Sequence, residues 1–277
     1  SILRSVERLI SGKTFSENDC VQIGAGDTRW CSFSHHTSFA RSSREEFLEH
    51  ANMALKAAHE HFLSCSKVII TLGTSWCYRH IQSDMIVSNC LKHPAAEYNR
   101  EFLPASQTAD ILTEIMNLCN GSDDGFTPKE FIFTVSPIRH FKDGAHGNQV
   151  SKASLLLGVE DFIAGYAGAA DYFPAYEIMM DELRDYRFYA DDMTHPSPLA
   201  IDYIWQRFAQ TAISEESQRL MDRIAKISQA ASHRPFNPQS DAYHNFCQKQ
   251  LEEIEKINQT YPAIDFSEEK AIFIAHL

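Results

Sequence analysis

The chain has 277 residues, of which 25 are lysine or arginine and 37 are aspartate or glutamate, so its formal net charge is −12. This acidic balance argues against a nucleic-acid-binding protein, which usually presents a basic face, and against adhesion to anionic lipid. Hydrophobic residues make up 44% of the chain, enough for a sizeable core, and no stretch approaches the about 18 apolar residues of a membrane span.

Seven cysteines are scattered without a C-x-x-C pair, a pattern that matches neither a disulfide framework nor a zinc ribbon. Reduced thiols are typical of a cytoplasmic protein, and we expect that location. The residues after Ser1 already read as a helix, and no signal peptide is visible. We therefore expect the sequence to begin inside a longer protein.

In the first part of the chain, two helix patterns precede a strand pattern. Helices are predicted over residues 2–10, ended by Gly12, and over residues 45–63. Residues 13–43, between them, are irregular and polar. Lys67–Leu72 is a short β-branched run that predicts a buried parallel strand rather than an edge strand.

The rest of the chain continues the alternation of strands and helices. Short strands are predicted over residues 85–87, 131–135 and 171–173. Helices are predicted over residues 106–119, 150–166, 176–185, 198 to about 231, and 241–261. Ser197 and Pro198 form a favourable helix start, with serine as N-cap and proline at the first helical position.

This alternation predicts an α/β fold, a three-layer α/β/α arrangement in which helices cover both faces of a mostly parallel sheet. We expect residues 1–232 to form this domain and residues 233–277 to form a helical extension packed on it. In parallel sheets, ligands bind beyond the carboxyl ends of the strands. Candidate site residues should therefore follow Leu72, follow Val135 and precede Ser197.

The first of these loops contains Gly73, Thr74 and Ser75. A glycine directly after a strand lets the backbone turn sharply and expose its N–H groups, as an oxyanion site requires. The two hydroxyl groups add further donors. An ordinary strand-to-loop turn is the alternative interpretation.

The other two loops carry charged and titratable side chains. Ser136, Arg139 and His140 follow the second strand, where a guanidinium can hold a carboxylate through paired hydrogen bonds. Asp192 and His195 have D-x-x-H spacing directly before a helix. An aspartate there can bond the imidazole Nδ1 and leave Nε2 free as a general base. A surface ion pair and a solvated helix-entry histidine are the alternatives.

Other candidate groups carry weaker signals. His35 and His36 are adjacent, so their side chains diverge, and no H-x-x-x-H or H-E-x-x-H pattern is present; we expect no metal and no cofactor. Cys90 follows the short strand at 85–87 and is interpreted as a small buried residue rather than a nucleophile.

Several segments together resemble one known family, GSCFA, which is related to the SGNH/GDSL hydrolases. The matching segments are T-L-G-T-S-W at 71–76, N-C-L-K at 89–92, T-V-S-P-I-R-H at 134–140, N-Q-V-S-K at 148–152, Y-F-P-A-Y-E-I at 172–178, D-E-L-R-D-Y-R-F-Y at 181–189 and D-M-T-H-P at 192–196. The resemblance covers most of the chain and implies an SGNH-like fold.

The resemblance also implies roles for particular residues. Asp192 and His195 correspond to the late D-x-x-H pair of a Ser-His-Asp mechanism, and Gly73 to Ser75 correspond to the oxyanion block, with Ser75 where an asparagine is expected. The G-S-C-F-A segment, whose serine resembles the nucleophile, is absent from this sequence, and only Ser38 lies in a faintly similar context. We therefore expect the first strand and the nucleophile to be missing.

Three functions follow as hypotheses. The first is an ester hydrolase or acyltransferase acting on a small or carbohydrate-linked ester, without nucleic-acid or membrane partners and with a homodimer left open. The second is an inactive module that binds a glycan or acyl ligand through Arg139, His140, Trp76 and Tyr176. The third is a metal hydrolase that uses His140, Asp192 and His195.

Overall fold

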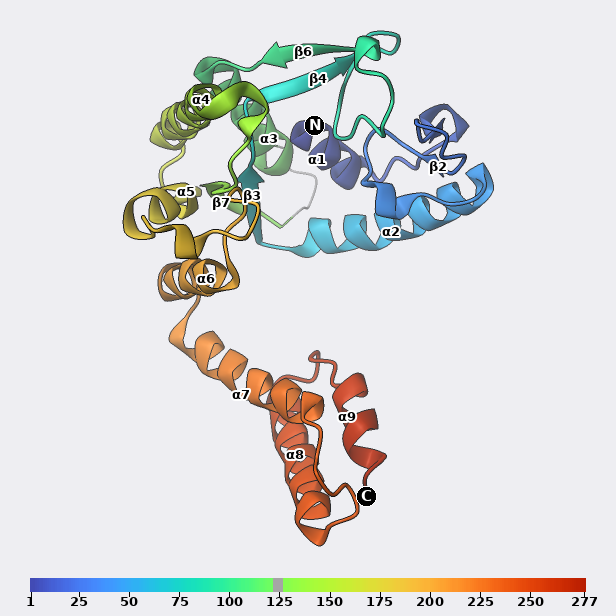
Figure 1. The fold of residues 1–277 in the computed structure, drawn as a ribbon, viewed down its shortest axis with the longest axis vertical. Helices are drawn as coiled ribbons and strands as arrows, with labels where there is room; N and C mark the ends of the chain where they lie inside the picture. Colours follow the sequence, from blue (N-terminus) through green and yellow to red (C-terminus); the bar gives the residue numbers. More distant parts are fainter. Residues whose placement is uncertain (122–126) are drawn as a thin grey trace. The chain divides into compact units, whose positions relative to one another are not determined.

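The computed structural model describes residues 1–121 and 127–277. Contacts divide the chain into two compact units, Ser1–Ile204 and Trp205–Leu277 (Figure 1). The boundary expected from the sequence, between residues 232 and 233, lies in the loop between two helices of the second unit.

The first unit contains helices and two principal sheets. Its helices are α1 (Ile2–Ser11), α2 (Arg44–Ser64), α3 (Ala105–Asn120), α4 (Gly144–Gly165), α5 (Ala175–Glu177) and the first part of α6 (Pro198–Ala212). Its strands are β1 (Val21–Gln22), β2 (Trp30–Cys31), β3 (Lys67–Leu72), β4 (Trp76–His80), β5 (Met85–Val87), β6 (Tyr98–Phe102), β7 (Glu130–Val135) and β8 (Ala170–Phe173). The fold is therefore α/β, as predicted.

The central sheet is parallel, with the order β3-β7-β8. One face carries Ile70 and Leu72 of β3 and Phe131, Phe133 and Val135 of β7, all buried against apolar residues of α1, α3 and α4. Burial of these side chains is the main stabilising contribution, at about 1.5–3 kcal/mol for each fully buried large residue.

Strand β3 differs from its prediction, because it lies at the edge of the described sheet rather than inside it. Its alternate residues Lys67, Ile69 and Thr71 are exposed, and Ile69 keeps 55% of its surface accessible. Two of these three residues are polar, which is the alternation of a half-buried strand. Because the third exposed residue, Ile69, is apolar, the sequence does not show this alternation clearly and predicted a continuous apolar run.

A second, antiparallel sheet has the order β5-β4-β6. The sequence predicted β5 but not β4 or β6, which combine aromatic residues with charged ones and show no clear period. Arg79 of β4 pairs with Glu101 of β6 at 2.7 Å across the sheet. Helices α1, α2 and α3 and strands β7 and β8 were predicted to within about one residue, whereas α4 begins earlier than predicted. Strands β1 and β2 were not predicted, because they lie in the segment 13–43 that was expected to be irregular. The helix expected over residues 176–185 is α5 followed by a π-helical turn.

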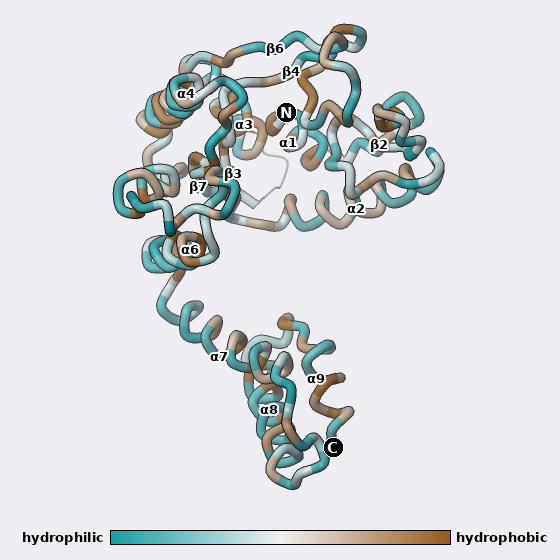
Figure 2. The backbone as a smooth tube through the Cα atoms, in the orientation of Figure 1, coloured by the Kyte–Doolittle hydropathy of each residue, from teal (hydrophilic) through white to brown (hydrophobic). Residues whose placement is uncertain are grey.

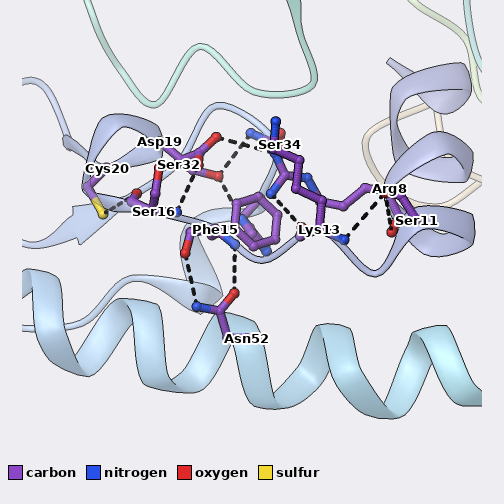
Figure 3. A network of polar contacts seen from close by, with 11 residues as sticks. Arg8, Ser11, Lys13, Phe15, Ser16, Asp19, Cys20, Ser32, Ser34 and Asn52 are labelled. Carbon is purple, nitrogen blue, oxygen red and sulfur yellow. Dashed lines mark hydrogen bonds and ion pairs between the residues drawn. The ribbon is translucent and has the colours of Figure 1, made fainter.

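The polar segment 13–43 is fixed to its neighbouring helices (Figure 3). The amide of Asn52 on α2 forms two hydrogen bonds with the backbone of Phe15, at 2.7 and 3.0 Å. Arg8 of α1 stacks on the Phe15 ring at 3.8 Å and pairs with Asp19 at 3.3 Å. These contacts join the segment to both α1 and α2.

The second unit consists of α7 (Glu215–Ser232), α8 (Asp241–Thr260) and α9 (Ser267–Ile274), together with the end of α6. Ser214 and Ser240 cap α7 and α8 through their side chains, as expected for helix N-caps. Figure 2 shows apolar and polar residues alternating along both helices. Their apolar residues form a separate core, and helix α9, which the sequence did not predict, closes it with Phe273.

Within the described ranges, no helix combines the length and apolar character needed to cross a bilayer.

Candidate active site

Asp192 and His195 form the hydrogen-bonded pair that their spacing predicts. The Asp192 carboxylate accepts the backbone N–H groups of Thr194 and His195 at 2.8 and 2.9 Å and the imidazole Nδ1–H at 2.5 Å. These hydrogen bonds hold the pKa of the Asp192 carboxyl well below its usual range. The ionised carboxylate fixes the tautomer that leaves Nε2 as an acceptor.

Both side chains of this pair are half exposed, at 50% for Asp192 and 56% for His195. In residues 1–121 and 127–277, no side chain hydrogen-bonds to Nε2 of the imidazole. The loop is anchored by a backbone hydrogen bond from Ala190 N–H to His195 O at 2.8 Å. Nε2 is therefore available to a reacting group that approaches from solvent.

The loops after β3 and β7 are joined by a buried lysine of α4. Lys152 is 1% exposed, and its Nζ donates to the carbonyl oxygens of Gly73 and Ser136, each at 2.6 Å. Burial lowers the pKa of Lys152 to about 8, and both carbonyl dipoles favour its charged form. This lysine therefore holds the carboxyl ends of the two strands together.

Lys152 also sets the direction of the peptide group between Gly73 and Thr74. The carbonyl oxygen of a trans peptide points opposite to the N–H of the next residue, and the chain has no cis peptide bonds. Because Gly73 O points to the buried ammonium, the Thr74 N–H points away from it. No acceptor in the described part of the chain bonds to that N–H. Among the residues described, it is therefore a free donor at this bend.

The neighbouring hydroxyl groups have a structural role instead. Ser75 is fully buried; its N–H donates to Ser151 Oγ at 2.7 Å and its hydroxyl donates to Ser151 O at 2.9 Å. The Thr74 hydroxyl bonds with the same Ser151 Oγ at 2.9 Å. Both hydroxyl groups therefore hydrogen-bond with Ser151 on α4, and the backbone of this bend is what remains for an oxyanion site.

Gly73 directly follows β3 and has a backbone conformation that other residues can also adopt. Its φ angle is outside the left-handed region, and a Cβ atom added there would meet only the Nε2 of His140, at 3.8 Å. The absence of a side chain therefore leaves room in front of His140.

His140 connects the three loops. Its Nε2 faces Gly73, its backbone N–H donates to Asn148 Oδ1 at 2.9 Å, and Arg139 N–H donates to Thr194 O at 3.2 Å. Burial, followed by the charges of Lys152 and His195, lowers the pKa of the His140 imidazole. The loop after β3, the loop after β7 and the D-x-x-H loop thus meet at one edge of the sheet.

Ser136 and Arg139 occupy different positions in this arrangement. Ser136 is buried, and its hydroxyl accepts the Ile138 N–H at 3.3 Å, which closes the turn after β7. The Arg139 guanidinium lies 4.0 Å over the Tyr189 ring, and Nη2 donates to the Tyr189 hydroxyl at 2.5 Å. Of these two residues, Arg139 lines a pocket, together with Tyr189, and Ser136 does not.

The sequence profile of the GSCFA family matches residues 1–208, and that of the GSCFA domain protein, C-terminal domain, matches residues 224–277. The chain belongs to the GSCFA family. No curated protein and no solved structure matches it.

Sequence reasoning missed three residues that organise the GSCFA site: Asn148, Ser151 and Lys152. They lie within the segment N-Q-V-S-K, which was noticed only as part of the resemblance. A lysine and two small polar residues on the buried face of an otherwise apolar helix were a usable signal, because a buried charge requires partners. Tyr189 was missed in the same way.

Other residues considered from the sequence lie as follows. The Tyr176 hydroxyl donates to Gln149, and its ring lies 5.6 Å from Lys152 Nζ. Trp76 packs under Arg100 at 4.2 Å. The Ser38 hydroxyl bonds with His36 Nδ1 at 3.1 Å, on the segment that precedes α2.

Burial raises the pKa of the Cys90 thiol, which disfavours the reactive thiolate. The described ranges contain no group of three or more histidine, cysteine, aspartate or glutamate side chains placed to hold a metal ion. His140, Asp192 and His195 therefore do not form such a group in this GSCFA chain.

Proposed function

We propose that this chain belongs to an SGNH-type ester hydrolase or acyltransferase, acting on a small or carbohydrate-linked acyl ester. The observation that carries the proposal is the Asp192–His195 pair, with Nδ1 bonded to the carboxylate and Nε2 unoccupied. That arrangement is what a general base needs to remove a proton from an attacking hydroxyl group.

In the proposed reaction, His195 Nε2 accepts the proton of a serine hydroxyl as its oxygen bonds to the acyl carbon. Asp192 orients the imidazole and stabilises the imidazolium that forms. The proton then passes to the departing alkoxide, and the ester C–O bond breaks. Water, or an acceptor alcohol, removes the acyl group in a second cycle of the same proton transfers.

The negative charge of the tetrahedral intermediate requires a donor that is already oriented. Thr74 N–H meets this requirement, because Lys152 orients the peptide group and no acceptor among the described residues bonds to the N–H. We assign it, rather than the side chains of Thr74 or Ser75, to the oxyanion site.

We place the nucleophilic serine outside the 277 residues. The proposal includes an SGNH-like, three-layer fold. A further parallel strand would add to the side of β3 that no described strand pairs with. The seven free cysteines agree with a reducing compartment, and we assign the protein to the cytoplasm.

Hydrolysis of p-nitrophenyl acetate tests the proposal, measured for this chain and for any natural form extended upstream of Ser1. We expect turnover in the form that carries the serine, and a loss of about 10³-fold or more for His195→Ala. His36→Ala, which removes an exposed histidine bonded to Ser38, is the matched control and should leave the rate unchanged.

Equal turnover by His195→Ala and its parent would contradict the proposal. Loss of turnover on chelation would favour the metal hydrolase instead. A glycan that raises the melting temperature of the extended form without being turned over would favour the binding module.

A further inference from the structure

A pocket of about 220 Å³ lies beside the D-x-x-H loop. Its lining residues are Arg139, Met179, Met180, Leu183, Arg184, Asp185, Tyr186 and Tyr189. Two backbone contacts join it to the loop: Arg139 N–H donates to Thr194 O, and Tyr189 forms a β-bridge with Pro196. The pocket therefore borders the loop that carries Asp192 and His195.

One wall of this pocket is an uncommon element, a π-helical turn at Ile178–Glu182. Such turns occur frequently at functional sites. The turn supplies Met179, which is fully buried, and the partly exposed Met180, while Leu183 follows it. Flexible thioether side chains adapt to irregular apolar ligands. This wall suits an apolar group of modest size.

The charges of the pocket do not cancel. Arg184 pairs with Asp181 and Asp185 pairs with Arg187, each at 3.1 Å. Arg139 is half buried and pairs with no carboxylate among the residues described; its recorded polar partner on the guanidinium is the neutral Tyr189 hydroxyl. The pocket therefore holds one guanidinium whose charge is not compensated.

The stacked guanidinium is also oriented. It lies 4.0 Å over the Tyr189 ring, with Nη2 bonded to the hydroxyl of that ring. A planar guanidinium held in this way keeps further N–H donors for a planar anion. A monoanion neutralises one guanidinium, whereas a dianion would leave excess negative charge beside Asp185. A carboxylate therefore fits better than a phosphate.

We propose that this pocket binds a carboxylate with a short apolar or aromatic body. The carboxylate bonds to Arg139, and the body packs against Met180, Leu183 and Tyr186. If this ligand is part of the substrate, the substrates are esters that carry a carboxylate. That step of the inference rests on the proposed function.

Binding of benzoate and hexanoate to the full chain, measured by titration calorimetry or ligand-observed NMR, tests the inference. We expect dissociation constants on the order of 1 mM. Benzamide and hexanamide, which match these ligands in shape but carry no charge, should bind at least about tenfold more weakly, as expected when a charge-assisted hydrogen bond is lost. This comparison uses only the unmodified protein.

Two arginines of the same pocket provide matched variants. Arg139→Met should weaken benzoate binding at least about tenfold, whereas Arg184→Met, whose partner is Asp181, should change it by less than about twofold. Arg139→Lys keeps the charge but not the planar donors, so we expect intermediate binding. Circular dichroism checks that each variant is folded.

Equal binding of benzoate and benzamide would overturn the inference, as would tighter binding of inorganic phosphate than of benzoate. Hydrolysis measured on the same preparations separates the two proposals. If His195→Ala abolishes turnover and benzoate does not bind, only the pocket is misassigned. If benzoate binds through Arg139 and His195→Ala has the same turnover as its parent, only the proposed reaction is wrong.

Discussion

The Nζ of Lys152 lies 2.6 Å from the carbonyl oxygen of Gly73, although one residue is on α4 and the other follows β3. The same Nζ reaches Ser136 O, which follows β7. An ammonium group removed from water is unfavourable unless hydrogen bonds compensate it. Here both compensating oxygens come from strand ends, so satisfying the lysine also fixes the edge of the sheet where the candidate site lies.

Replacing this lysine should loosen the site. Lys152→Met keeps the side-chain length but leaves two buried carbonyl oxygens without donors, and we expect the free energy of unfolding to fall by about 2 kcal/mol. Urea denaturation measures the change. Lys56→Met, at an exposed position on α2, is the control and should change stability by less than about 0.5 kcal/mol. Equal effects of the two substitutions would contradict this role for Lys152.

Gly73→Ala should separate stability from activity. The new methyl group would make an ordinary contact with His140 Nε2, at 3.8 Å, and the backbone conformation is open to alanine. We expect the melting temperature to change little, but ester hydrolysis by the extended form to fall at least about tenfold, because the methyl group would lie beside the proposed oxyanion donor, Thr74 N–H. Unchanged hydrolysis would show that this face of Gly73 does not meet the substrate.

Two glycines of α4 should respond in opposite directions. A Cβ at Gly158 would lie 2.6 Å from the Cβ of Thr108 and 2.7 Å from Ala105 O, where α3 and α4 approach closely. We expect Gly158→Ala to destabilise the chain by about 1–3 kcal/mol. A Cβ added at Gly165 would meet no neighbouring atom within 4 Å, so Gly165→Ala should be neutral or stabilise the chain by up to about 1 kcal/mol. Thermal unfolding measures both; destabilisation by the second variant would contradict the prediction.

His35 should make stability depend on pH. Burial, followed by the charges of Arg8 and His50, lowers its pKa from 6.5 to about 4. The unfolded chain then binds this proton more readily than the folded chain, so the contribution is complete above pH 6.5 and is lost as the pH falls to 4. We expect a loss of about 2 kcal/mol from this residue.

Unfolding midpoints recorded at pH 7 and pH 4.5 check this expectation. His35→Gln should show a smaller difference between the two pH values than the parent, whereas His36→Gln, at the neighbouring exposed position, should show the parent's difference. A parent-like difference in the His35 variant would assign the pH dependence to other groups.

Local patterns predicted most of the elements of this chain. The spacing of apolar residues located α2, α3 and α8 to within about one residue, because an apolar helix face is encoded over a few neighbouring positions. Strands β4 and β6 were not recognised, since their pairing depends on residues about 22 positions apart, such as Arg79 and Glu101. Such long-range pairing leaves little local signal.

The contact within the candidate site was predictable from the sequence, but the residues that hold its loops together were not. The D-x-x-H spacing alone predicted the contact of Asp192 with His195, because three residues suffice to turn the carboxylate back to the ring. The role of Lys152 required knowing that α4 lies beneath both strand ends. The orientation of the Thr74 N–H depends on that packing, so the residues around Thr74 in the sequence do not predict it.

Strand β3 ends its sheet with the backbone groups of one side unpaired among the described residues and with Ile69 on the surface. Such a strand can template the addition of extended chains from other molecules, and lysines beside it act as gatekeepers. On β3, Lys67 is the lysine on the exposed face, and it forms an ion pair with Glu130. Preparations of this chain should therefore self-associate as concentration rises, and Ile69→Lys is the change that would keep them dispersed.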